Sequence, residues 1–197
     1  MAIVRDRGRA NGEGGWVRVW DPLLRLAHWG LAAAVTLALV SSDDRRLHEA
    51  AGYAALGIVG LRVVWGFVGP AHARFTDFVR APGTVLAYLR DVFRLSARRH
   101  LGHNPAGGAM ILALFALVLV AGVSGWMSET DRFFGVTWVE DLHSGSANLL
   151  LFLIIGHVVG VIASSMLHGE NLVRAMITGR KPAKVSPPYG NAETEEA

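Results

Sequence analysis

The chain has 197 residues, of which 52% are hydrophobic and 18% charged, a balance more apolar than that of an ordinary soluble domain. It contains no cysteine, which excludes disulfides, thiolate zinc sites, iron–sulfur clusters and covalently attached c-type haem. The net charge is +3, and the basic residues lie beside long apolar runs, which favours a membrane surface over nucleic acid as the partner.

The N-terminal part combines a polar segment with a first apolar stretch. Residues 1–16 are polar and glycine-rich, and we expect them to be disordered. Residues 23–40 form the first stretch, which carries Arg25 and His28 near its start. A secretory signal within residues 1–40 is an alternative that would remove His28, but its basic lead is long and no clear A-x-A cleavage site follows.

Three further apolar stretches follow, at residues 47–68, 106–127 and 142–167. The last two contain 22 and 26 residues without a formal charge. At about 1.5 Å per residue, each crosses a hydrocarbon core of about 30 Å. The sequence therefore predicts an all-α integral membrane protein, built as a four-helix up-down bundle.

Basic residues are divided unevenly between the segments that alternate between these spans. The N-terminus counted through Arg25, the loop 70–105 and the C-terminal segment hold 15 Lys and Arg residues, whereas the two intervening loops hold 3. The positive-inside rule then predicts that both termini lie in the cytoplasm.

Short amphipathic segments accompany the spans on the basic side. We expect Thr84 to cap a surface helix whose apolar face carries Leu86, Leu89 and Phe93, and residues 170–179 to form a similar helix. Residues 181–197 are expected to be a disordered cytoplasmic tail. Residues 17–180 then form one four-span domain.

Four histidines lie within or at the ends of the spans: His28, His48, His143 and His157. The fourteen residues between His143 and His157 make about four turns, so both side chains leave one helix face about 21 Å apart. The up-down order places His48 at the depth of His143, and His28 at the depth of His157. Paired histidines in a bundle core hold haem iron, although interfacial histidines or a proton relay in a transporter remain alternatives.

Other polar residues are weaker candidates. The loop histidines His72, His100 and His103 are expected to be solvated, whereas His168 shares a helix face with His157 and is a substitute ligand candidate. Arg62 lies at the depth of His157, where it needs an anion such as a haem propionate or a quinone oxygen, unless it snorkels to the interface. Glycines along the second and fourth spans permit close approach of a flat macrocycle or of another helix: Gly52, Gly57, Gly60, Gly145, Gly156 and Gly160.

Four segments resemble the bacterial cytochrome b561 family and the related b-type cytochrome subunits of nickel–iron hydrogenases: VWDPLLRLAHW (19–29), LHEAAGYAALGIVGLRVVWGFVGP (47–70), GHNPAGGAM (102–110) and LHSGSANLLLFLIIGHVVG (142–160). The resemblance implies two non-covalent haem b groups, each bound by two histidines, with His28, His48, His143 and His157 as the ligands. Two histidines per iron leave no open coordination position, which favours electron transfer over oxygen chemistry.

The implied function is electron transfer between a membrane quinone and a periplasmic redox protein, such as a c-type cytochrome, in a respiratory chain. Acidic outer loops suit a basic partner. Ser144 stands where hydrogenase subunits tend to have a basic residue, so we favour a general carrier over a hydrogenase anchor. A haem-free transporter or scaffold is the alternative from another class, and a homodimer or larger complex stays open.

Overall fold

The computed structural model describes residues 15–183. The elements follow in the order β1 (Trp16–Arg18), α1 (Pro22–Val40), α2 (Arg45–Val68), α3 (Phe75–Phe78), α4 (Pro82–Phe93), α5 (Pro105–Ser128), α6 (Thr137–His168), α7 (Leu172–Thr178) and β2 (Arg180–Pro182). Four of these helices, α1, α2, α5 and α6, are long and apolar enough to cross a membrane. The predicted all-α membrane fold with four spans is confirmed.

Side-chain caps explain where three of the four long helices begin. Asp21 accepts a hydrogen bond from the Leu24 amide at 3.0 Å, and Asn104 accepts one from the Gly107 amide at 2.7 Å. Proline follows both caps, at a position where its missing N–H costs nothing. Asp44 caps α2 in the same way. α6 begins at Thr137, five residues before the predicted apolar run, and no side chain caps its start at Val136.

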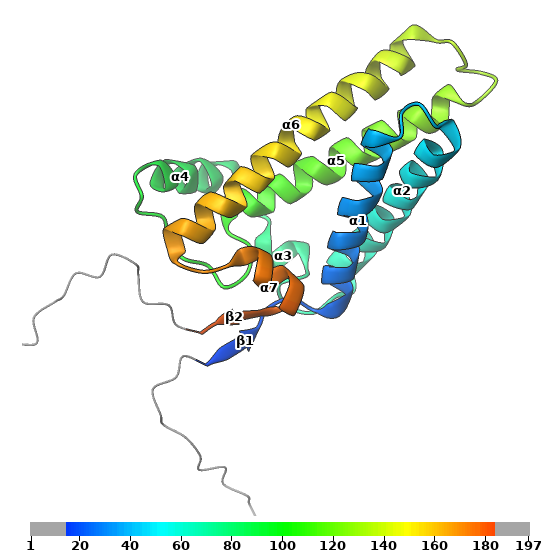
Figure 1. Cartoon of the computed structure of the whole chain (residues 1–197). Helices are drawn as coiled ribbons and strands as arrows, with labels where there is room; N and C mark the ends of the chain where they lie inside the picture. Colours follow the sequence, from blue (N-terminus) through cyan, green and yellow to red (C-terminus); the bar gives the residue numbers. More distant parts are fainter. Residues whose placement is uncertain (1–14, 184–197) are drawn as a thin grey trace, which may run out of the picture.

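The four long helices form two hairpins, α1–α2 and α5–α6, which pack against each other through α2 and α5 (Figure 1). An apolar core fills the bundle, built from Ala34, Val35, Ala55, Val59, Val118 and Leu150. Figure 1 shows α3, α7 and both strands gathered at one end of the bundle, where the described chain starts and finishes. We name this the inner end, and the opposite end, with the α1–α2 and α5–α6 turns, the outer end.

The surface helix α4 differs from the prediction at its start. Ala81 is the N-cap residue and Pro82 opens the helix, so Thr84 lies inside the first turn and caps nothing. Proline at the first helical position sets this boundary. The apolar side chains Leu86 and Phe93 remain 67% and 87% exposed, as expected for a helix lying on a membrane surface.

The ordered domain is slightly longer than the predicted range 17–180. β1 and β2 pair antiparallel, with Trp16 opposite Pro182 and Val17 opposite Lys181. The predicted disordered ends 1–16 and 181–197 are therefore wrong at these positions, because backbone pairing of the two ends organises them. Residues 1–14 and 184–197, the rest of both predicted tails, lie outside the described residues.

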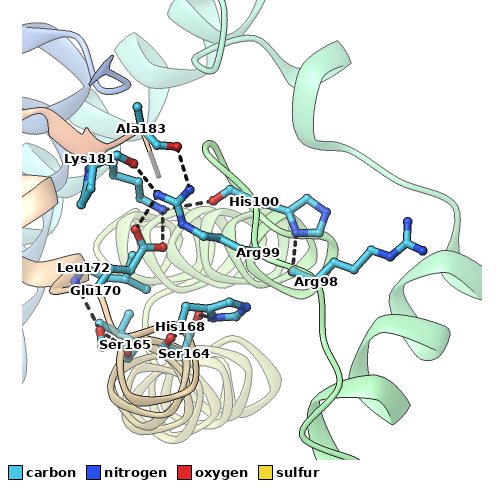
Figure 2. A network of polar contacts seen from close by, with 12 residues as sticks. Arg98, Arg99, His100, Ser164, Ser165, His168, Glu170, Leu172, Lys181 and Ala183 are labelled. Atoms are coloured by element: carbon cyan, nitrogen blue, oxygen red, sulfur yellow. Dashed lines mark hydrogen bonds and ion pairs between the residues drawn. The ribbon is translucent and has the colours of Figure 1, made fainter. Parts of the chain in front are cut away.

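A network of buried ion pairs connects three segments of the chain at the inner end (Figure 2). Glu170 lies between Arg99 and Lys181, with oxygen–nitrogen distances of 3.2 Å and 3.4 Å. The Glu170 and Lys181 side chains are 5% and 4% exposed. Burial lowers the pKa of Lys181, while Glu170 opposes that shift. The network joins the loop before α5 to β2 and to the segment after α6.

Candidate functional site

The structure brings the four predicted histidines together as two pairs. His28 on α1 faces His157 on α6 with 6.3 Å between ring centroids, and His48 on α2 faces His143 on α6 with 5.9 Å. The first pair lies toward the inner end and the second toward the outer end, because α6 separates its two histidines by about 21 Å. These are the pairings that the helix depths predict.

The spacing within each pair suits two nitrogens on opposite sides of one metal ion. An imidazole nitrogen binds a transition metal at about 2 Å, and the ring centroid lies about 1 Å behind it, so two opposed rings have centroids about 6 Å apart. No group of three or more His, Cys, Asp or Glu side chains within residues 15–183 is placed to hold a metal ion. Two histidine nitrogens alone do not complete a coordination sphere, so each pair would hold a metal ion that brings further ligands of its own, as haem iron does.

The outer pair is oriented by the backbone. The Nδ1 atom of His48 lies 2.9 Å from the Ala38 carbonyl oxygen, and that of His143 lies 2.8 Å from the Ala121 carbonyl oxygen. A carbonyl only accepts, so each Nδ1 carries the proton and donates it. The Nε2 lone pair of each ring is then free to bind a metal, and hydrogen bonds from Nδ1 to a carbonyl select this tautomer in metal-binding histidines.

Space is open beside His48 for a flat group. Gly52 lies four residues after His48 on the same face of α2, and a Cβ atom added there would meet nothing within 4 Å. At Gly125 an added Cβ would lie 3.0 Å from the His143 ring, so this glycine makes space for the histidine itself. The pairs also bridge the two hairpins, which pack together mainly through α2 and α5. The residues present therefore fit haem.

The remaining histidines depart from expectation in two places. The His168 ring nitrogens lie 3.0 Å and 3.2 Å from the carbonyl oxygens of Ser164 and Ala97, so this histidine is engaged elsewhere and is a poor substitute ligand. His103 is not solvated. Its ring packs against Trp20 at 4.5 Å and Phe78 at 5.0 Å between centroids.

Burial and, next, the positive charge of Arg62 lower the pKa of His103 to about 3, so its ring is neutral. Sequence reasoning missed this residue as a site candidate. The signal in the sequence was its position directly before Asn104, the residue that caps α5. Arg62 is also buried, with only 6% exposed, which excludes snorkelling to the surface within this fold.

A membrane-spanning four-helix bundle with two facing histidine pairs, one toward each end, belongs to the class of membrane cytochromes. A family model described as prokaryotic cytochrome b561 matches residues 19–179, and the chain belongs to this family. It is a multi-pass b-type cytochrome of membrane electron transfer. This membership counts against a haem-free transporter or scaffold.

Curated relatives agree with the family. The chain is 26% identical to a protein of Azotobacter vinelandii named "Probable Ni/Fe-hydrogenase B-type cytochrome subunit", over 83% of this chain and 87% of that protein. It is 27% identical, with the same coverage, to a protein of Azotobacter chroococcum mcd 1 that has the same name. No solved structure matches the chain.

Proposed function

We propose that the chain binds two haem b groups, one between His28 and His157 and one between His48 and His143, and carries electrons between the two membrane faces. The observation that supports this most is the ring spacing of 6.3 Å and 5.9 Å, repeated at two depths of one bundle. Haem b bound at such positions supplies one-electron redox chemistry.

The histidines, the carbonyls that orient them and the apolar core would each contribute to that redox chemistry. The two histidines of each pair would hold one haem iron, and a haem held by two histidines would supply electron transfer in preference to oxygen chemistry. The carbonyl oxygens of Ala38 and Ala121 hold the outer rings in one tautomer and orientation. Buried Val59, Val118 and Leu150 keep water out of the space between the helices.

The proposed orientation places both termini in the cytoplasm and the protein in a bacterial inner membrane. The division of 15 basic residues against 3 supports it. Reporter fusions within residues 70–105 should then score as cytoplasmic, and fusions within 129–136 as periplasmic. The reverse result would place the His48–His143 pair at the cytoplasmic face.

We further propose that the electrons pass between membrane quinone and a periplasmic redox protein such as a c-type cytochrome. Exposed carboxylates at the outer end support a basic partner there: Asp43, Asp44, Asp131, Glu140 and Asp141. Exposed Trp138 and Phe134 beside them, at 55% and 74%, add the aromatic contact area typical of protein interfaces.

A second candidate is a cytochrome subunit of a hydrogenase-type complex. The names and the 83% coverage of both curated relatives favour it, whereas Ser144 and the short outer loops favour a free carrier. Purification from native membranes in mild detergent separates the two: a free carrier elutes without a partner in fixed ratio. A nickel-containing protein that co-elutes in such a ratio would establish the second candidate.

The test of the electron-transfer function is spectroscopic and kinetic. Purified protein should show a b-type haem spectrum on reduction, and acid–acetone should extract all of the haem, because the chain has no cysteine to retain it. A quinol should reduce the protein, and oxidised c-type cytochrome should reoxidise it. About one haem per chain, or reduction by quinol with no transfer to a periplasmic acceptor, would refute the respective part of the proposal.

A further inference from the structure

Unsatisfied polar atoms gather at the inner end of the bundle. Six buried side-chain nitrogens among residues 15–183 have no hydrogen-bond partner, and each belongs to the inner half: Arg25 Nε, His28 Nδ1, Arg62 Nη1, Trp65 Nε1, Arg99 Nε and His103 Nδ1. Native proteins satisfy nearly all of their buried polar groups. Four of the six are N–H donors of Arg or Trp side chains, and so many donors in one region point to a group with acceptor oxygens that binds there.

Arg62 has the strongest need for a partner among these residues, because its side chain carries a permanent positive charge and is buried. Its residue is 6% exposed, and its Nη1 atom has no partner. It follows His48 by fourteen residues on α2, which places it about 21 Å along the helix at the depth of His28. A guanidinium does not lose its proton in a protein, so burial requires a counter-anion.

The chain supplies no such anion at ion-pair distance within residues 15–183, where the ion pairs involve other arginines and Lys181. Asp21 is the carboxylate whose charge acts on Arg62. However, its Oδ1 atom accepts the Leu24 amide at 3.0 Å and caps α1. Asp21 is thus held at the helix start and leaves Arg62 Nη1 without an acceptor.

His103 provides a second buried nitrogen near Arg62. Its ring packs against Trp20, and Trp65, one turn after Arg62 on α2, packs against the cluster that contains Trp20, so Arg62 and His103 lie in one region. The positive charge of Arg62 acts on the His103 ring there. The His103 ring is held by Trp20 and Phe78, and its Nδ1 atom is buried without a partner. The neutral ring donates from this atom to a carboxylate in its Nδ1–H tautomer.

We propose that Arg62, with His103 beside it, binds a propionate carboxylate of the haem held by His28 and His157. The inference rests on the proposed function, since it requires a haem at the inner pair. A carboxylate fits better than a quinone oxygen because a neutral quinone would leave the buried guanidinium charge uncompensated. A charge-assisted bond of this kind is about twice as strong as a neutral one.

The experiment measures how fast the inner haem leaves the full chain for an excess of a soluble haem-binding apoprotein. Wild type and Arg62→Gln are each loaded with haem b or with its dimethyl ester, whose propionates carry no charge. We expect Arg62→Gln to speed loss of inner haem b roughly tenfold to a hundredfold, and not to speed loss of the ester. Arg46→Gln, at the exposed outer start of the same helix, is the matched control and should change neither rate.

The arms of the experiment separate the outcomes. Wild type alone should lose the ester faster than haem b, and this comparison tests the inference even if Arg62→Gln misfolds. Arg62→Lys keeps the positive charge, so its rate of haem b loss should lie between those of wild type and Arg62→Gln. Equal loss of both forms from wild type would overturn the propionate assignment and leave the two-haem function standing. An Arg62→Gln effect confined to quinol reduction would assign Arg62 to a quinone oxygen instead. Wild type that binds no haem at His28 and His157 would refute both proposals.

Discussion

Removing one histidine of a pair should remove one haem and spare the other. The rings within a pair are 6.3 Å or 5.9 Å apart, whereas α6 separates His143 from His157 by about 21 Å. No single imidazole therefore serves both sites. Replacing His48 or His143 by Ala should lower the content from about two haem groups per chain to about one, with loss of the outer haem. Replacing His28 or His157 should lower it equally, with loss of the inner haem.

Double variants sharpen the expectation. The variant with His48→Ala and His143→Ala should lose no more haem than either single change, because both act on one site. The variant with His28→Ala and His143→Ala should lose nearly all haem. Extractable haem per chain and redox titration of the spectral components measure the outcome. His168→Ala is the control on the same helix, since its ring nitrogens already contact backbone carbonyls. If His28→Ala and His143→Ala abolish the same component, the pairing is diagonal and the reasoning is refuted.

Two further substitutions test the surroundings of the site. Gly125→Ala would bring a Cβ within 3.0 Å of the His143 ring and disturb its bond to the Ala121 carbonyl, so the outer haem should leave roughly tenfold faster while the inner haem is unaffected. Glu170→Gln leaves two largely buried cations without a counter-charge and should cost about 3 kcal/mol of stability on unfolding in detergent. Arg45→Gln, which removes the exposed outer ion pairs with Glu49 and Glu129, should cost less than about 1 kcal/mol, and a cost equal to that of Glu170→Gln would contradict the argument.

The spans and the histidine pairs were predictable because both depend on helix periodicity. A run of 22 or more residues without charge fixes a transmembrane helix regardless of its neighbours. Within such a helix, fourteen residues fix both the face and the depth of two side chains. Only the alternation of the spans was then needed to place His48 near His143 and His28 near His157, as the ring distances show.

The inner end was not predictable in the same way, because long-range contacts build it. Trp16 and Lys181 stand 165 positions apart in the chain yet belong to the same two-stranded sheet. His103 lies in a basic loop that local composition marks as solvated, and only packing against Trp20 and Phe78 buries it. Thr84 is a good capping residue, but Pro82 lies two positions earlier and starts the helix first.

The two ends of the bundle should respond differently when haem is removed. At the outer end, the Nδ1 atoms of His48 and His143 keep their carbonyl partners without any cofactor. At the inner end, Arg62 and His103 retain buried nitrogens without partners, and such atoms cost about 1–3 kcal/mol each when unsatisfied. Haem removal should therefore raise amide hydrogen exchange more around the start of α5 and in α3 than around the α1–α2 turn. Removal of only the outer haem, through His48→Ala, should leave exchange at the inner end near its original level. If removal of both haem groups instead raises amide exchange more at the outer end, the unsatisfied nitrogens of the inner end are not what the cofactor stabilises.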